Sequence, residues 1–469
     1  MSVFLAIAAM LLLQSAACAQ AAVATITDAP DPNQAASSTS TPPDPNHEFD
    51  RWNLFYQATS IGMTHPAFHS PYVGPLSLEP YAEHDVSLTT TLFFAARLEQ
   101  NTVFVFNPEV AGGRGFSGVN GLANQPNGEL PRVGKATPTP YIARLFIQHD
   151  FGFGKEKEHV DRDENVLAGN RPMTRYSIYA GRFSLTDYFD NNAYTHDPRT
   201  QFMAWAVMYN GAWDYPADTR GYTWGIVQEF HTRHWSLRYG IAAMPKVANG
   251  PRLDRRLFRD HGQVGEVERR YSLRNRDGAI RALYYANRAQ AGNYGEALRQ
   301  AAITGTTPSV ISTRRVGTLK YGVGISFNQA LSADVGIFTR LGWNDGKTES
   351  FAFTAMDRLA SGGVSVKGTS WKRKNDVIAT SFTTGGLSRV HSEYLAAGGL
   401  DFLIGDGRLN YAPEMVWESY YSARLFPGFF ASLGMQRDTN PAYNHDRGPV
   451  MIYLLRLHIG LGLKPWQPQ

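Results

Sequence analysis

The 469-residue chain contains a single cysteine, Cys18. It lies in an N-terminal segment that carries no charged side chain, is apolar from Val3 to Leu13 and ends in Ala17-Cys18-Ala19, a small-x-small cleavage pattern. We therefore expect residues 1–19 to be a signal peptide. The alternative, a lipoprotein acylated at Cys18, is disfavoured because Ser15 stands where such a signal has leucine. A mature chain without thiols has to be stable without disulfides, which requires a large fold.

After this segment, no run reaches the roughly 18 apolar residues that a membrane-spanning helix needs. The chain also has little excess charge of either sign, because 45 Lys and Arg against 41 Asp and Glu leave a net charge of +4. An avid nucleic-acid binder carries a larger or more clustered basic excess. An exported chain of this kind can reside in the periplasm, outside the cell, or in the outer membrane as a β-barrel.

Aromatic residues (12%) and 44 glycines are abundant instead, a composition typical of strands and turns. Residues 20–50 are rich in Ala, Ser, Thr, Pro and Asp, and we expect a low-complexity linker there, which cannot bury enough apolar surface to fold. No further break in composition follows. We therefore expect one domain over residues 51–469.

Apolar residues in this domain recur with a period of two. The clearest segment places Met451, Tyr453, Leu455, Leu457 and Ile459 opposite side chains that include Arg456 and His458. Such alternation puts the two sets on opposite faces of a strand. A soluble β fold, with the apolar face inward, remains the alternative to a membrane barrel with the apolar face outward.

Three features favour the membrane barrel. Arg or His recurs on the less apolar face of successive strands. Long loops such as residues 107–140 alternate with short ones. Tyr and Trp also stand near strand ends, as in the aromatic girdles of membrane barrels. These aromatic residues are Tyr141, Tyr176, Tyr222, Trp224, Trp235, Tyr239 and Tyr453.

Chain length predicts the size of this barrel. At about 26 residues for a strand with its share of turn and loop, the domain has room for about 16 strands, which is wide enough for an aqueous lumen. Short helices are expected at residues 294–302 and 387–397, in loops or folded into the lumen.

Two motifs typical of soluble proteins lack the surrounding sequence that their function requires. Gly113, Gly115 and Gly118 match a dinucleotide-binding string, but the Gly- and Pro-rich residues after them cannot start the required helix. The Asp and Asn cluster at residues 187–197 lacks calcium-loop spacing, although a bound cation there is left open. No nucleophile motif appears, and no pair of carboxylates stands out as catalytic. We therefore expect no catalytic residues, no metal and no cofactor.

The sequence resembles the carbohydrate-selective porins of the OprB type, outer-membrane channels of Gram-negative bacteria. The resemblance is most specific in residues 181–191, 196–202, 211–215 and 217–225, and it extends over most of the chain, from Trp52-Asn53-Leu54 to the final strand with Arg456 and His458. The chain continues past Leu463 with Lys-Pro-Trp-Gln-Pro-Gln, which departs from the terminal aromatic common in outer-membrane barrels. The resemblance implies a 16-stranded transmembrane antiparallel β-barrel that passes small, glucose-like carbohydrates by passive diffusion and is not an enzyme. Its expected partners are such sugars and outer-membrane lipid. We expect a monomer, with association of barrels left open.

Alternation and charge together predict the pore-lining residues. We expect them to be Gln57, Arg97, Glu109, Arg144, Arg182, Arg199, Arg220 and Arg238, with Asp197, Asp214 and Glu229 as counter-charges. Trp224 is added as a stacking surface for a sugar, although alternation assigns it to the lipid face. Two alternative functions remain: a barrel for other small solutes or for polysaccharide export, and a secreted all-β carbohydrate-active enzyme or lectin.

Overall fold

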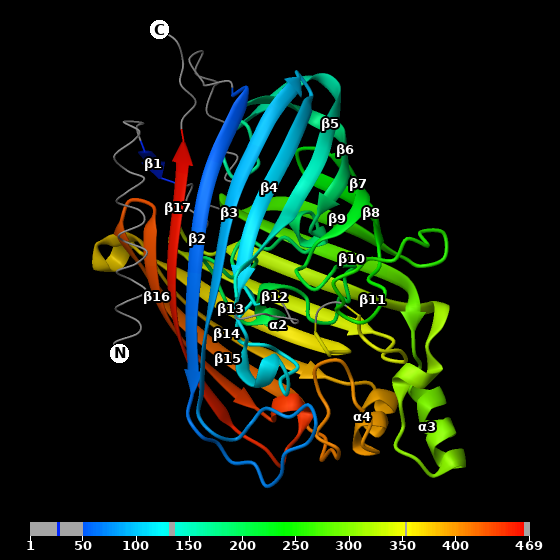
Figure 1. The fold of residues 1–469 in the computed structure, drawn as a ribbon. Coiled ribbons are helices and arrows are strands. Elements are labelled where there is room, and N and C mark those ends of the chain that lie inside the picture. Colours follow the sequence, from blue (N-terminus) through cyan, green and yellow to red (C-terminus); the bar gives the residue numbers. More distant parts are fainter. Residues whose placement is uncertain (1–25, 29–49, 131–136, 352–353, 464–469) are drawn as a thin grey trace.

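Sixteen long antiparallel strands close into a barrel in the computed structural model, which describes residues 26–28, 50–130, 137–351 and 354–463 (Figure 1). Each strand pairs with its sequence neighbours, and β17 pairs with β2 to close the wall. A short strand, β1 (Ile26–Asp28), adds to the end of β17. The wall strands are β2 (Trp52–His65), β3 (Glu83–Glu99), β4 (Thr102–Gly112), β5 (Thr139–Val160), β6 (Gly169–Phe183), β7 (Thr223–His231), β8 (Trp235–Ala243), β9 (His261–Leu273), β10 (Arg276–Ala291), β11 (Arg315–Ala330), β12 (Val335–Asn344), β13 (Arg358–Gly368), β14 (Arg373–Gly386), β15 (Glu414–Phe426), β16 (Phe429–Thr439) and β17 (Val450–Leu463).

The expected barrel of about 16 strands is thus confirmed. The signal peptide and the end of the chain lie outside the described residues, as does the linker apart from β1 and Asp50. Among the described residues, no helix has both the length and the apolar character needed to span a membrane.

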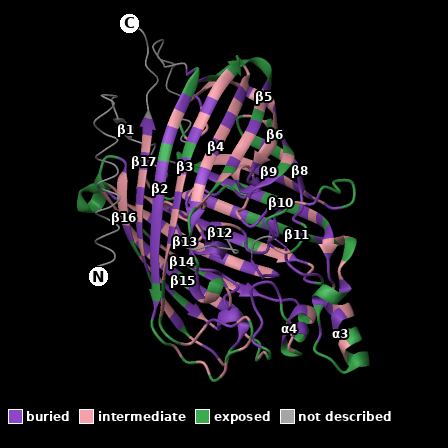
Figure 2. Ribbon diagram, in the orientation of Figure 1, coloured by how far each residue is buried: buried purple, intermediate pink, exposed green. Residues whose placement is uncertain are grey.

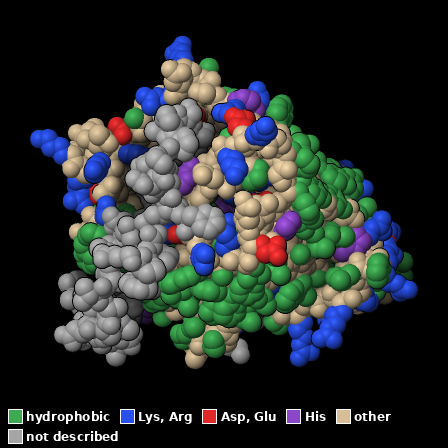
Figure 3. Space-filling view, turned by 90° about the horizontal axis from the view of Figure 1, so that it is seen from above, with side chains coloured by type: hydrophobic (Ala, Val, Ile, Leu, Met, Phe, Trp, Pro, Cys, Tyr) green, Lys and Arg blue, Asp and Glu red, His purple; other side chains and the backbone are tan. Residues whose placement is uncertain are grey.

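Strand alternation is inverted relative to a soluble protein. On β11, Leu319, Tyr321 and Val323 are 39–49% exposed on the outer surface, whereas the intervening Lys320 is 3% exposed. Figure 2 shows such alternating stripes along the strands. From above, hydrophobic side chains gather on the barrel flank and charged ones at the rim (Figure 3). Because an apolar outer face is stable in lipid and not in water, this arrangement excludes the soluble β fold.

The two ends of the barrel differ in the length of their connections. At one end, tight turns such as residues 274–275 and 427–428 join the strands. At the other end lie the long loops, including 184–222, 387–413 and the loop 113–138, of which residues 113–130 and 137–138 are described. The loops contain α2 (Trp205–Met208), α3 (Tyr294–Thr304) and α4 (Arg389–Ala396), and the two expected helices are therefore confirmed as α3 and α4. Short 3-10 helices lie at Phe116–Gly118, Leu185–Asp187, Val310–Thr313, Thr369–Trp371 and Pro441–Tyr443.

Residues 184–222, which we call the inserted loop, cross the barrel interior. Wall side chains from several sides bind the backbone of this loop. Arg340 on β12 donates to the carbonyl of Val207 (2.7 Å), Arg456 on β17 to that of Gln201 (2.6 Å), and Tyr285 on β10 to that of Ala212 (2.9 Å). Since β10, β12 and β17 lie on different parts of the wall, the loop spans the lumen between them.

Glu418 on β15 fixes the same loop from a further side. Its two carboxylate oxygens accept the backbone N–H groups of Met203 (2.7 Å) and Ala204 (3.0 Å), and its side chain is fully buried. Glu414, at the start of β15, binds the N–H groups of Ala123 and Asn124 in the loop 113–138 in the same way. Buried carboxylates of the wall thus anchor both loops.

The glycine string of the loop 113–138 starts no long helix. Gly113, Gly115 and Gly118 have φ of 144°, 76° and 69°, and only a 3-10 turn, Phe116–Gly118, follows. A left-handed backbone of this kind favours glycine. The string is therefore part of a loop that folds against the wall, where Gly113 approaches Leu130 and Ser87 too closely to leave room for a side chain.

His391 links the two loop helices to the barrel. Its imidazole stacks on Tyr294 of α3, with ring centroids 4.2 Å apart, and its Nδ1 lies 2.9 Å from the Asp357 carboxylate, directly before β13. Asp401 lies 3.2 Å from Nε2. Burial alone lowers the pKa of His391, but the two carboxylates outweigh burial and raise this pKa to about 9. The charged imidazolium therefore holds α3 and α4 in place.

Replacing the Glu418 carboxylate should loosen the inserted loop. In Glu418→Gln, one of the two carboxylate acceptors becomes an NH₂ group that faces a backbone N–H, so we expect a loss of about 1–3 kcal/mol in unfolding free energy. Urea titration followed by heat-modifiable gel mobility measures this loss. The matched control is Glu393→Gln on the exposed surface of α4, which breaks only an exposed ion pair with Arg389. An equal effect of both substitutions would contradict the anchoring role of Glu418.

Stability should fall at alkaline pH through His391. Because its pKa is about 9 in the folded protein and about 6.5 in an unfolded chain, the imidazolium contributes its full stabilisation below about pH 6.5. The contribution, on the order of 3 kcal/mol, is lost as the pH rises through about 9. Thermal unfolding of the wild type and of His391→Gln at pH 7 and at about pH 10 measures it. The difference in stability between the two proteins should shrink at the higher pH, and a constant difference would disprove this contribution.

Candidate functional site

A polar pocket of about 100 Å³ opens between the inserted loop and the wall where β4 and β5 meet the long loops. That volume holds several water molecules, so the pocket is a hydrated part of the lumen. Its lining combines charged and aromatic side chains. Its charged and tyrosine side chains include Glu109, Glu129, Tyr141, Arg199, Arg220 and Tyr222.

Arg199 stands at the centre of the pocket and bridges two carboxylates. Its Nη2 lies 2.9 Å from Glu109 on β4, and its Nε lies 3.0 Å from Glu129 in the loop 113–138. Burial raises the pKa of Glu129, and the charge of Arg199 opposes this rise. Burial by itself lowers the pKa of Arg199, but Glu129 and Glu109 raise it well above its usual value. The guanidinium is therefore always charged and ties both loops to the wall.

Glu109 is held by neutral donors as well. The hydroxyl of Tyr141 donates to it, as does that of Tyr222 at 3.2 Å. Thr91 donates to its other oxygen at 2.5 Å, and Gln57 in turn donates to the Thr91 hydroxyl at 2.8 Å. This network fixes the carboxylate, so that its charge stays at one point of the lumen.

Two further arginines flank Tyr222. Arg144 on β5 pairs with Asp187 at 2.5 Å, and Arg182 at the end of β6 pairs with Asp218 at 2.6 Å. Their guanidinium carbons lie 5.5 and 5.8 Å from the centre of the Tyr222 ring. Cations at this distance are attracted to the ring face. The pocket and its immediate surroundings thus combine arginines with carboxylates and tyrosines.

The structure brings together six of the sequence-predicted pore residues: Gln57, Glu109, Arg144, Arg182, Arg199 and Arg220. Asp197 lies in the inserted loop and accepts the backbone N–H of Arg199 at 3.0 Å. Asp214 accepts the backbone N–H of Phe351 at 2.9 Å and lies 3.7 Å from Lys320, away from the pocket.

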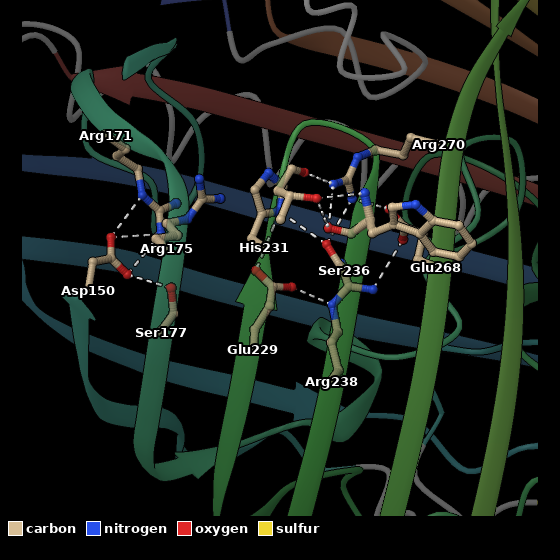
Figure 4. Close-up of polar contacts among 12 residues, drawn as sticks. Asp150, Arg171, Arg175, Ser177, Glu229, His231, Ser236, Arg238, Glu268 and Arg270 are labelled. Carbon is tan, nitrogen blue, oxygen red and sulfur yellow. Dashed lines mark hydrogen bonds and ion pairs between the residues drawn. The ribbon is translucent and has the colours of Figure 1, made fainter. Parts of the chain in front are cut away.

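Glu229 and Arg238 belong to a second polar cluster on the inner wall (Figure 4). Arg238 on β8 pairs with Glu229 on β7, and with Glu266 (2.8 Å) and Glu268 (3.1 Å) on β9. Arg270, next to Glu268 in this cluster, donates to the carbonyl of Thr232 in a tight turn. The cluster therefore lies toward the turn end of the barrel, at a different depth from the pocket.

Two predicted residues lie elsewhere. Arg97 is near the turn end, where its guanidinium donates to the backbone carbonyls of Asp50 (3.1 Å) and Gln100 (3.1 Å). Trp224 is 49% exposed and alternates with the buried Thr223 and Val227, so it faces outward and does not line the lumen. The inclusion of Trp224 was wrong, because strand alternation fixes its direction.

Glu129, Tyr141, Asp218 and Tyr222 line the pocket but were not among the predicted pore residues. The same holds for Asp187, which pairs with Arg144 beside the pocket. Tyr141 and Tyr222 were expected in the outer aromatic girdles, yet both hydroxyls bind Glu109 inside. Tyr222 stands one residue before β7, so strand alternation does not apply to it. Glu129 reaches the pocket only because its loop folds inward, which no local pattern indicates.

The acidic cluster at residues 187–197 is used for internal contacts. Asp187 pairs with Arg144 and Asp190 with Arg340 at 2.9 Å, and the Asp197 carboxylate accepts the backbone N–H of Arg199 and the hydroxyl of Thr200. Within residues 50–130, 137–351 and 354–463, no three His, Cys, Asp or Glu side chains come together in a way that would hold a metal ion.

Comparison with known structures matches this architecture. OprB of Pseudomonas putida, in its high-pH structure, aligns over 88% of this chain and 94% of its own, at 14% identity and a TM-score of 0.65. Its low-pH structure aligns over 87% and 91%, at 11% identity and a TM-score of 0.44. OccAB1 of Acinetobacter baumannii aligns over 89% and 98%, at 10% identity and a TM-score of 0.47. At 14% identity, the similarity to the high-pH structure supports the fold alone.

The family assignment comes from the sequence comparison. A search of curated proteins gave no match. The family model described as "Carbohydrate-selective porin, OprB family" matches residues 84–461, which include the pocket and nearly the whole barrel. The chain therefore belongs to the OprB family of carbohydrate-selective porins, channels of the bacterial outer membrane.

Proposed function

We propose that the pocket around Arg199 is the selectivity constriction of this porin, and that small glucose-like sugars cross the barrel beside it. The observation that carries the proposal is the bridge from Arg199 to Glu109 and Glu129, which joins the inserted loop, the wall and a second loop around one pocket. The family and the fold are those of a channel for small carbohydrates rather than of an enzyme.

The chemistry of a sugar matches this lining. A sugar ring carries hydroxyl groups that both donate and accept hydrogen bonds, and it has C–H faces that lie against aromatic rings. Carboxylates accept from the hydroxyls and guanidinium groups donate to them, which replaces part of the hydration shell as the sugar passes. Because Glu109 and Arg199 are already bonded to protein groups, a sugar exchanges bonds with them only weakly. Weak binding favours transit, since a deep energy minimum would trap the solute.

The second cluster, around Arg238, is proposed as a later polar contact on the same path. Its arginines and carboxylates alternate across β7, β8 and β9, as in the pocket. Interspersed charges of both signs give a local transverse field and no ring of one sign. This arrangement supports passage of neutral polar solutes in preference to one class of ion.

Three statements about the whole protein are part of this proposal. Residues 1–19 are removed as a signal peptide, residues 20–50 link to the barrel domain 51–469, and the barrel functions as a monomer that contacts outer-membrane lipid through its apolar flank. The long loops, including residues 113–138 and 184–222, then face the cell exterior, as in other outer-membrane barrels.

Liposome swelling tests the proposed function. Purified protein in liposomes should admit glucose and arabinose faster than an amino acid of similar size, because only the sugars present several hydroxyls to the constriction. Empty liposomes give the background. Equal rates for all three solutes would remove the preference for sugars and leave a general small-solute channel. No uptake of sugar monomers would favour an export barrel.

Removing Arg199 should change the ion selectivity of the channel. In Arg199→Gln, Glu109 and Glu129 lose their shared counter-charge, so the constriction becomes more negative and attracts cations. We expect the reversal potential in a KCl gradient across a planar bilayer to move toward that of a cation-selective pore. Arg315→Gln, which breaks an exposed ion pair with Glu296 outside the pocket, is the control. An unchanged reversal potential in Arg199→Gln would place the constriction elsewhere.

A further inference from the structure

Arg220 differs in its partners from Arg199 in the pocket and from the neighbouring Arg144 and Arg182. Arg199, Arg144 and Arg182 each pair with a carboxylate at 3.0 Å or less. Within the described part of the chain, Arg220 has no carboxylate partner, and its guanidinium lies over the ring of Tyr141, 4.3 Å from the centroid. It is half-buried and lines the pocket.

The backbone around Arg220 is fixed by a tight turn. Its N–H donates to the Asp218 carboxylate at 2.9 Å, and the N–H of Gly221 donates to the Asp218 carbonyl at 2.9 Å. Gly221 has φ of 90°, which a residue with a side chain rarely adopts. The Tyr141 ring under the guanidinium is held in turn by its bond to Glu109. Arg220 is therefore held at the pocket while its N–H donors stay available.

A guanidinium without an internal ion pair at this position can bind solutes that carry a carboxylate. Its planar set of donors matches a carboxylate, which can accept two parallel hydrogen bonds from it. A solute carboxylate does not have to displace an internal partner at Arg220, as it would at Arg199 or Arg144. Glu109 and Glu129 stand nearby to accept from sugar hydroxyls, and they repel solutes with a higher negative charge.

We propose that Arg220 recognises the carboxylate of monocarboxylate sugars such as hexuronates, so that the porin passes sugar acids as well as neutral sugars. The inference rests on the proposed constriction. It adds a specificity-determining residue for charged sugars to the function proposed above.

The test compares glucose with glucuronate, which differ only at C6, in proteoliposomes near neutral pH, where the glucuronate carboxyl is ionised. The ratio of glucuronate uptake to glucose uptake is measured for the wild type, Arg220→Gln and Arg220→Lys. We expect Arg220→Gln to lower the ratio roughly five-fold, and Arg220→Lys, which keeps the charge without the planar fork, to give an intermediate ratio.

Arg408→Gln is the matched control, because Arg408 also lies over a tyrosine ring, that of Tyr72 (3.6 Å to the centroid), outside the pocket. Heat-modifiable gel mobility verifies that each variant is folded. An unchanged ratio in folded Arg220→Gln, or an equal decrease in Arg408→Gln, overturns the inference.

The wild-type rates separate this inference from the proposed function. Uptake of glucose with a ratio insensitive to Arg220 overturns only the role of Arg220. Uptake of glucuronate without glucose, lost in Arg220→Gln, supports the role of Arg220 and overturns the preference for neutral sugars.

Discussion

The buried charges of the barrel wall are bound to the backbone of the loops that fill the lumen, and the rest of the structure depends on these contacts. Arg340 and Arg456 are at most 1% exposed, and their guanidinium groups donate to carbonyls of the inserted loop. Glu418, equally buried, accepts from backbone N–H groups. A charge removed from water is stable only when its hydrogen-bonding capacity is met. A loop backbone inside a barrel needs partners for the same reason. The buried side chains of the wall and the backbone of the loop therefore meet each other's hydrogen-bonding capacity.

This arrangement explains how a wide barrel acquires a narrow polar site. Sixteen strands enclose a lumen too wide for the wall alone to contact a small solute on all sides. Because the inserted loop is fixed at several points of the wall, Arg199 and Asp187 are held opposite Glu109 and Arg144. The proposed selectivity constriction is therefore formed at the junction between loop and wall, and no single strand contains it.

The sequence predicted what strand alternation and chain length determine. Alternation indicated which residues face the lumen, including Glu109, Arg144 and Arg238, and it placed Trp224 on the lipid side. The two short helices were recognised from their local pattern. The depth of each inward residue was not predictable, because a period of two defines a face and not a height. Glu229 and Arg238 thus joined one predicted set with Arg199, although they lie in a separate cluster.

Loop residues were the least predictable part. Glu129 and Tyr222 enter the pocket through the path of their loops, which long-range contacts such as those of Glu414 with Ala123 and Asn124 determine. The direction of Tyr141 depends on an irregular register between β4 and β5 near Asn107 and Pro108, which a strict alternation does not include. The family resemblance covers the sequence of these segments, but it does not indicate which of their side chains are in contact.

The seam between β2 and β17 has a consequence for biogenesis. These strands pair along 11 positions, from Tyr453 with Thr64 to Leu463 with Leu54, although they stand at opposite ends of the domain. Within the wall, β2 therefore gains its partner at this edge only when the last strand of the domain is present. An unpaired edge readily binds other chains, so pairing with β17 protects this edge of β2 from such contacts. The cylinder is closed only by joining the two ends of the domain, and a chain that lacks β17 leaves β2 with an open edge.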